Sequence, residues 1–366
     1  MDNNSESLYY IWLTQIKGVG VITVRKLLNI FKSPEKIYKS NIDDLIEIEG
    51  IGIEKSKLII QSKDLTKAEA ILKSCYDKNI KISNINDNYF PETLKKYDDN
   101  PILLYYKGNL DSKLIGVAIV GSRRCTEYGK KVTVEAAEVL AKNNVTVISG
   151  MAKGIDSYAH TTCLKAGGFS AAILGCGADI CYPKEHINLM RKIIDEGVII
   201  SEYPPGTPPK PEHFPKRNRI ISSLSNKVLI TEAGEKSGVL ITAEYAIKQN
   251  KEIYVVSGDI YSKEFKGSNK LISEGVKIYL NPEQLLDKHH EIRTKETKDS
   301  EEKSNNTSLR KSIIEVIKGK RLTIDEITSK INCNKKELNN ELFLMEIDSK
   351  VECFRDGKYG IVNKAT

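Results

Sequence analysis

The sequence predicts an α/β protein with a doubly wound domain in the middle of the chain, a small helical domain before it and a compact module after it. Between residues 114 and 280, short apolar runs alternate with polar turns and segments of helical period. This alternation is typical of parallel strands joined by crossover helices. The length of 366 residues exceeds one ordinary hydrophobic core, so two or three domains are expected. The apolar runs cover residues 117–120, 145–148, 171–174, 198–200, 227–230, 253–256 and 276–278.

The first of these units, residues 117–156, carries the clearest functional signal. Its first apolar run stops abruptly at Gly121-Ser122-Arg123-Arg124, and its second is followed by a turn that contains Lys153 and Gly154. Ligands of parallel sheets bind outside the carboxyl ends of the strands, where both turns would stand. One turn offers a guanidinium and the other an ammonium. An anion is therefore the first ligand to expect.

Composition limits the class of protein without deciding its function. The formal charge of +7 and the pI near 8.8 favour an anionic partner, but lysine is abundant throughout the chain, so position must decide. The seven cysteines contain no Cys-x-x-Cys pair, which predicts reduced thiols and no metal site. The N-terminus lacks a signal-peptide pattern, and no apolar run is long enough to span a bilayer. The expectation is a soluble, cytoplasmic protein without membrane contact.

Residues 1–75 are expected to be a small helical domain with two helix-hairpin-helix motifs, of the kind called SAM-like. The near-copies Ile16–Gly20 and Ile48–Gly52 each precede a helical segment, at 21–31 and 53–62. In such motifs the glycines let backbone N–H groups reach a phosphate at the next helix. The alternative is that they only make tight turns. DNA contact by this domain stays open at this point.

Residues 76–287 are assigned to the sheet domain. Its entrance contains two short predicted strands, 80–82 and 102–106, and Pro101 marks the second as an edge strand. The dinucleotide fingerprint Gly-x-Gly-x-x-Gly is absent, because the third glycine is missing after Gly175-Cys176-Gly177. No nicotinamide cofactor is expected.

The segment from Lys210 to Arg219 places four cations and one aromatic residue within ten positions, just before an apolar helix. Cations at a helix N-terminus oppose the helix dipole, so another group should compensate them. A phosphate backbone would do so. The alternative is a solvated basic face.

The rest of the chain predicts a linker and a winged-helix domain. Residues 288–306 are polar and charged, which predicts a flexible linker, and the pair His289-His290 in it is expected to be exposed rather than metal-bound. Residues 307–366 predict three helices, at 309–317, 323–331 and 335–348, followed by a hairpin around Asp356-Gly357. The third helix carries several acids, so contact with DNA and contact with a protein both stay open.

Candidate catalytic groups stand singly at the predicted strand ends and form no recognisable set. Asp156 and His160 could share a helix face, but a helix-stabilising acid and a packed histidine explain them equally well. The loop Thr231–Gly238 leads into a predicted helix at 239–249, and its two glycines favour anion binding over simple capping by Ser237. Phosphate binding is expected, and catalysis is not. The other candidates are Glu202, His213, Glu232 and Glu244.

Seven blocks of sequence in residues 80–285 resemble the DNA-processing protein A family, DprA, also called Smf. The helical N-terminus and the predicted winged helix match the three-part layout of many members. One turn departs from the family pattern: Val256–Ile260 stands where many members have Pro-Gly-Ser, so no contact is assigned there. The matching blocks are GSRR, SGMAKGID, GCGADICYP, ISEYPPG, FPKRNRIISSLS, TEAGEKSGVLITA and GSNKLISEG.

The resemblance implies a recombination mediator with an extended Rossmann fold, no catalytic activity and no cofactor. Such proteins bind and protect incoming single-stranded DNA, help to load the RecA recombinase during natural transformation, and act as homodimers. Lys153 and Gly154 are also predicted site residues, because of their place in the second turn and not because of the resemblance. Phe214 would either stack a base or anchor its loop. The family pocket carries over to Gly121, Ser122, Arg123, Lys184, Phe214, Lys216, Arg217, Asn218 and Arg219.

A second class of function is compatible with the same predicted sheet. Related Rossmann domains of the lysine-decarboxylase-like group bind nucleoside phosphates, and the loop with Gly234, Ser237, Gly238 and Glu244 weakly resembles theirs. The alternative is therefore a nucleotide-binding protein or an enzyme that hydrolyses nucleoside phosphates.

Overall fold

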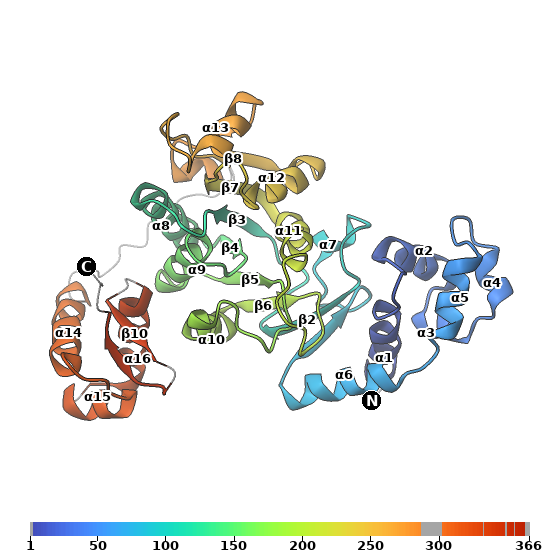
Figure 1. The fold of residues 1–366 in the computed structure, drawn as a ribbon, viewed down its shortest axis with the longest axis horizontal. Coiled ribbons are helices and arrows are strands. Elements are labelled where there is room, and N and C mark those ends of the chain that lie inside the picture. The colour runs from blue at the N-terminus through green and yellow to red at the C-terminus, as the bar shows by residue number, and fades with distance from the viewer. Residues whose placement is uncertain (1–2, 287–301, 332, 348–349, 355, 363–366) are drawn as a thin grey trace. The chain divides into compact units, whose positions relative to one another are not determined.

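Nine strands form one sheet in the described part of the chain. The computed structural model describes residues 3–286, 302–331, 333–347, 350–354 and 356–362. The chain divides into two compact units, Met1–His290 and Glu291–Thr366. The sheet belongs to the first unit (Figure 1). In sheet order its strands are β1 (Lys81–Asn84), β2 (Leu103–Gly108), β6 (Val198–Ser201), β5 (Ser170–Leu174), β4 (Thr146–Ser149), β3 (Gly116–Gly121), β7 (Ser225–Glu232), β8 (Glu252–Val255) and β9 (Lys277–Ile278).

The strands from β6 to β9 run parallel, and this confirms the predicted doubly wound domain. All seven predicted apolar runs are strands. The prediction that residues 102–106 form an edge strand is wrong, because β2 pairs antiparallel with both β1 and β6. Pro101 precedes β2 and so removes no donor from its ladder.

The apolar runs are continuous because helices cover both faces of the parallel strands. Alternate residues of β3 enter different cores: Val117 and Ile119 pack with α8 (Glu127–Lys142) and α9 (Ile155–Lys165). Ala118 and Val120 pack with α11 (His213–Ser223) and α12 (Val239–Lys248) on the other face. Figure 1 shows this division. The remaining helices of the domain are α7 (Glu92–Lys95), η1 (Lys184–His186), α10 (Ile187–Glu196), α13 (Lys266–Ser273) and η2 (Pro282–Leu285).

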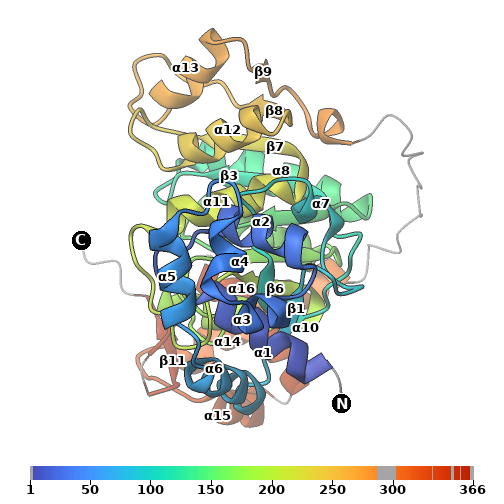
Figure 2. The ribbon, with the colours of Figure 1, turned by 90° about the vertical axis from the view of Figure 1, so that its right-hand side faces the viewer.

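The N-terminal helices pack on the edge of the sheet: α1 contacts β1 and β2, and α6 contacts β1. Figure 2 shows α1 and α6 near β1. Both predicted hairpin turns are present: Gly18 and Gly50 have φ of +81° and +78°, a conformation that favours glycine, and Gly20 and Gly52 are the N-caps of the next helices. The helices are α1 (Asn3–Thr14), α2 (Val21–Phe31), α3 (Pro34–Lys39), α4 (Ile42–Ile46), α5 (Ile53–Gln61) and α6 (Thr66–Asp77).

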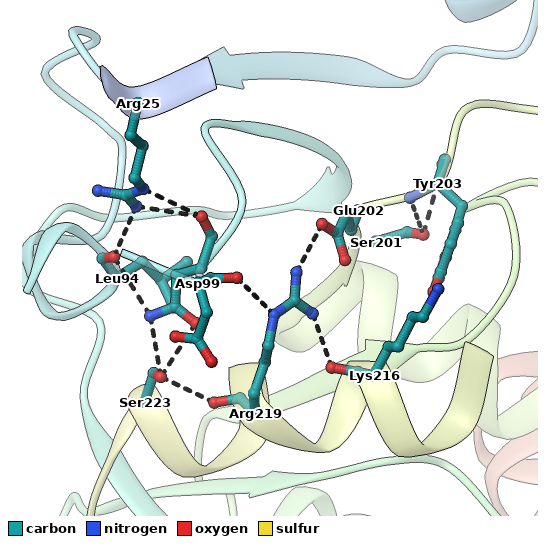
Figure 3. A network of polar contacts seen from close by, with 10 residues as sticks. Arg25, Leu94, Asp99, Ser201, Glu202, Tyr203, Lys216, Arg219 and Ser223 are labelled. Atoms are coloured by element: carbon teal, nitrogen blue, oxygen red, sulfur yellow. Dashed lines mark hydrogen bonds and ion pairs between the residues drawn. The ribbon is translucent and has the colours of Figure 1, made fainter. Parts of the chain in front are cut away.

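One arginine connects these N-terminal helices to the sheet domain. Arg25 of α2 is 8% exposed and donates to the carbonyls of Leu94 and Asn100, at 3.1 Å and 3.2 Å (Figure 3). The Asn100 amide in turn donates to the Ser223 hydroxyl at 2.9 Å, and that hydroxyl donates to the Arg219 carbonyl at 2.7 Å. This network runs from α2 to the end of α11 without a break.

The C-terminal unit contains the predicted elements in the predicted order. Three helices precede a two-stranded antiparallel hairpin, and Ile313, Ile327 and Leu342 are among the residues of its own core. Helix α14 begins at Glu302, so residues 302–306 of the predicted linker are helical. His289 and His290 lie outside the described residues, and the winged-helix assignment stays a prediction. The elements are α14 (Glu302–Ile317), α15 (Ile324–Ile331), α16 (Lys335–Ile347), β10 (Val351–Cys353) and β11 (Tyr359–Ile361).

Replacing the buried arginine should loosen the junction between the helical and sheet domains. Arg25→Met removes the donor of the buried Leu94 and Asn100 carbonyls, so the free energy of unfolding of the first unit should fall by about 3 kcal/mol. Chemical denaturation measures this change. Lys36→Met, at an exposed position of α3, is the control and should change stability by less than about 0.5 kcal/mol. Equal effects of the two variants would contradict the account.

Candidate nucleic-acid interface

The candidate site is a pocket of about 540 Å³ at the point where the sheet order reverses. The chain runs from β3 through β4 and β5 to β6 on one side, and returns to β7 on the other side of β3. A crevice outside the carboxyl ends is expected at such a reversal. The pocket is lined by Val120, Gly121, Ser122, Arg123, Ala152, Asp156, Tyr182, Pro209, Pro211, Phe214, Pro215, Arg217, Asn218, Ile221, Ser237, Gly238, Val239, Ile241 and Thr242.

The first turn of the pocket is held by close backbone packing. A Cβ at Gly121 would lie 2.5 Å from Ile155 Cγ1, so only glycine fits there. Gly154 has a φ of +73°, and a Cβ on it would lie 2.3 Å from the Ser122 carbonyl oxygen. That oxygen accepts a hydrogen bond from the Ile155 N–H at 3.2 Å. Gly154 thus holds the first turn in place and does not line the pocket.

An exposed cation and two aromatic rings form one wall. The Arg123 guanidinium lies over the Phe214 ring, 5.5 Å from its centroid. The Tyr182 ring lies beside Phe214, with centroids 5.5 Å apart and planes tilted by 34°. Arg123 is exposed and Phe214 is half-buried. The wall therefore offers both a positive charge and aromatic surface to a ligand.

The floor of the pocket contains a buried arginine. Arg217 is 5% exposed, and its Nη1 donates to the carbonyls of Gly150, at 2.8 Å, and Ile173. Asp156 accepts from the Gly150 and Ala152 N–H groups, at 3.1 Å and 3.3 Å. Burial lowers the pKa of Arg217 and raises the pKa of Asp156, and the attraction between the two opposite charges opposes both shifts. A Cβ on Gly150 would lie 2.4 Å from Arg217 Nη1, so this turn is built around the guanidinium.

Two cations of the same helix lie on another face. Arg219 donates to the Asp99 carbonyl at 2.7 Å, to the Lys216 carbonyl at 2.6 Å and to Glu202 Oε1 at 2.6 Å (Figure 3). It is 7% exposed. Both Lys216 and Arg219 line a second cavity, of about 650 Å³, and not the first pocket. The basic segment therefore faces two different cavities.

The two remaining predicted lysines are exposed but do not line the pocket. Lys153 forms an ion pair with Glu185, and Lys184 begins the short helix η1. The pocket thus brings together Gly121, Ser122, Arg123, Phe214, Arg217 and Asn218 from the predicted set. It leaves out Lys153, Gly154, Lys184, Lys216 and Arg219.

Several lining residues were not among the predicted site residues. Tyr182 lies on a loop after β5. The site is predicted from cations and glycines, and these patterns do not identify an aromatic residue. Ser237, Gly238 and Thr242 come from the start of α12, opposite the first turn. The favoured interpretation of the loop 231–238 as a ligand-binding loop predicts a site at this position.

The candidate catalytic groups are mostly used inside the protein. The buried Glu232 carboxylate accepts from the Thr126 N–H and hydroxyl, at 2.9 Å and 2.7 Å, and so fixes the start of α8. His160 is fully buried, with Nδ1 2.7 Å from the Ser170 hydroxyl oxygen. Burial lowers the pKa of His160 to about 3. Both residues therefore have structural roles.

Within the described ranges, no group of three or more His, Cys, Asp or Glu side chains is arranged to hold a metal ion. No helix in these ranges is both long and apolar enough to cross a membrane.

The fold and the pocket together define a class of protein: a doubly wound α/β domain with a basic, aromatic pocket, preceded by a helix-hairpin-helix domain. The chain belongs to the family described as DNA recombination-mediator protein A, whose sequence model matches residues 81–290. A model described as a SAM-like helix-hairpin-helix tandem matches residues 12–62 and confirms the predicted N-terminal domain.

Curated relatives agree with this assignment. Protein Smf of Synechocystis is 37% identical over 288 residues, which cover 77% of this chain and 72% of that protein. The DNA processing protein DprA of Streptococcus pneumoniae is 40% identical over 204 residues, which cover 56% of this chain and 72% of that protein. The predicted resemblance to DprA and Smf is confirmed.

Solved structures show the same relationship. The crystal structure of DprA from Streptococcus pneumoniae has a TM-score of 0.66 at 32% identity, and covers 75% of this chain and 95% of that chain. A structure of DNA processing protein A from Helicobacter pylori, determined for its single-stranded DNA binding mode, has a TM-score of 0.51 at 31% identity. The match covers 57% of this chain and 94% of that chain.

The buried histidine should make the protein sensitive to acid. Between pH 6.5 and about 3 the unfolded chain binds a proton at His160 that the folded protein does not, so stability falls as the pH is lowered. In His160→Gln the free energy of unfolding should change less steeply with pH than in the wild type, by about 1.4 kcal/mol per pH unit between pH 4 and 6. Denaturant unfolding at a series of pH values measures the two slopes. Parallel slopes for wild type and variant would show that His160 takes up its proton in the folded state.

Proposed function

We propose that this protein binds single-stranded DNA in the pocket at the reversal of the sheet order, and protects the strand during homologous recombination. The observation that carries the proposal is the wall formed by Arg123, Phe214 and Tyr182. It combines a free cation with aromatic surface at the edge of the sheet. Binding of a single strand without sequence preference needs both features, one for the backbone and one for the bases.

The assignment of residues follows from their placement. Arg123 contacts a phosphate, and the first turn and the α12 N-terminus line the same pocket. Phe214 and Asn218 line the pocket, and Arg217 supports its floor. Lys153 and Lys184 are exposed and would act on the strand only outside the pocket. Lys216 and Arg219 have no part in this binding pocket.

The wider role rests on family membership. We propose that the chain passes its strand to the RecA recombinase during natural transformation, and that it acts in the cytoplasm as a homodimer without a cofactor. We also propose the division into 1–75, 76–287, a linker at 288–306 and a winged-helix domain at 307–366, with residues 302–306 helical. A solution mass of twice 41.0 kDa would support the dimer, and the mass of one chain would oppose it.

An enzymatic role in hydrolysing nucleoside phosphates is not favoured. Glu232 and His160, two of the candidate groups for such chemistry, are fully buried in structural roles. Base release from nucleoside monophosphates would be the observation that restores this alternative.

Removing the exposed arginine should weaken binding to a single strand in a salt-dependent way. Arg123→Ala should lower the affinity for an oligothymidylate about tenfold at low salt. It should also reduce the slope of log K against log salt by about 0.7, the value for one phosphate contact on a single strand. Fluorescence anisotropy over a salt series measures both quantities.

The neighbouring Arg124→Ala is the matched control, because Arg124 is also exposed but does not line the pocket. It should leave affinity and slope close to those of the wild type. Preference of the wild type for duplex DNA, or equal losses in the two variants, would exclude this pocket as the binding site.

A further inference from the structure

The Phe214 ring has little free surface for a base. The Arg123 guanidinium lies over it at 5.5 Å from the centroid, and the Tyr182 ring lies beside it with centroids 5.5 Å apart. The Gly175 backbone packs against its edge so closely that a Cβ there would lie 2.9 Å from Phe214 Cδ1. Phe214 is thus occupied by three neighbours before any ligand arrives.

Tyr182, in contrast, keeps a large exposed surface. Tyr182 is 42% exposed and lines the pocket, although its ring contacts Phe214. A large aromatic ring that is exposed at the wall of a pocket is suited to bind a flat ligand group. Phe214 limits the movement of this ring from one side, so stacking on it costs little conformational entropy.

We infer that Tyr182 is the residue on which a nucleobase of the bound strand stacks, and that Phe214 supports both this ring and the phosphate-binding Arg123. The inference rests on the proposed function and adds the position of a base to it. It also decides between the two interpretations of Phe214 in favour of the supporting role. Because every base has an aromatic face, the contact is independent of sequence.

The geometry also predicts which part of the bound strand each side chain contacts: Arg123 the backbone and Tyr182 a base. Arg123 and Tyr182 both lie against the Phe214 ring, the guanidinium and the tyrosine ring each 5.5 Å from its centroid. A phosphate at Arg123 and a base at Tyr182 therefore belong to the same short stretch of strand. Duplex DNA cannot present this base without unpairing it, so the contact favours single strands.

Oligonucleotides with and without bases test this inference. Binding is measured for an oligothymidylate and for an oligomer of the same length whose central sugars are abasic, with wild type, Tyr182→Phe and Tyr182→Ala. Tyr182→Ala should lose about 5- to 150-fold in affinity for the oligothymidylate and almost none for the abasic oligomer. Tyr182→Phe keeps the ring and should bind both like the wild type.

Two further variants make the test specific. Tyr89→Ala removes another exposed tyrosine, 64% exposed and distant in sequence, and should leave both affinities unchanged. Phe214→Leu should weaken binding of both oligomers, because Arg123 and Tyr182 lose their common support.

The outcomes separate this inference from the proposed function. If the wild type binds neither oligomer, the proposed function fails. If it binds both, and Tyr182→Ala weakens them equally or not at all, the function stands and the stacking role of Tyr182 is refuted. A loss limited to the base-containing oligomer in Phe214→Leu, with none in Tyr182→Ala, would assign the stacking to Phe214 instead.

Discussion

The geometry of the pocket depends on the buried guanidinium of Arg217. A buried charge costs several kcal/mol unless it is hydrogen-bonded and neutralised. Here the Gly150 and Ile173 carbonyls accept from it, and Asp156 supplies the opposite charge. These partners come from the end of β4, from β5 and from α9. The contacts that stabilise the buried charge therefore fix these three elements relative to α11. The arginine therefore acts first as a structural cation within the protein.

The same helix connects the pocket to the N-terminal domain. One face of α11 carries Phe214 and Arg217 into the pocket, while Arg219 on another face is held by Glu202 and the Asp99 carbonyl. The end of the helix joins the network that leads through Asn100 to Arg25. The helix-hairpin-helix domain thus contributes to the position of a helix on which the binding site depends.

The strands could be predicted because helices cover both faces, which makes each buried strand a continuous apolar run. The site could be predicted only in part. The number of cations between Lys210 and Arg219 does not show which of them lie on the same face of the helix. The helical period does: it places Phe214, Arg217 and Asn218 on one face. Lys216 and Arg219 lie on the next face. Most internal partners of these arginines, such as Gly150, Ile173 and Glu202, lie far away in the sequence and leave no local pattern. No local pattern points to Tyr182 either, because only the folded loop brings it beside Phe214.

We expect a single strand of DNA to occupy the pocket between β3 and α12. A crystal structure of the protein with a short oligothymidylate tests it most directly. In the expected complex, a phosphate lies within hydrogen-bonding distance of Arg123 and a thymine ring stacks on Tyr182. A strand bound instead in the second cavity, against Lys216 and the N-terminal helices, with the first pocket unoccupied, would contradict it.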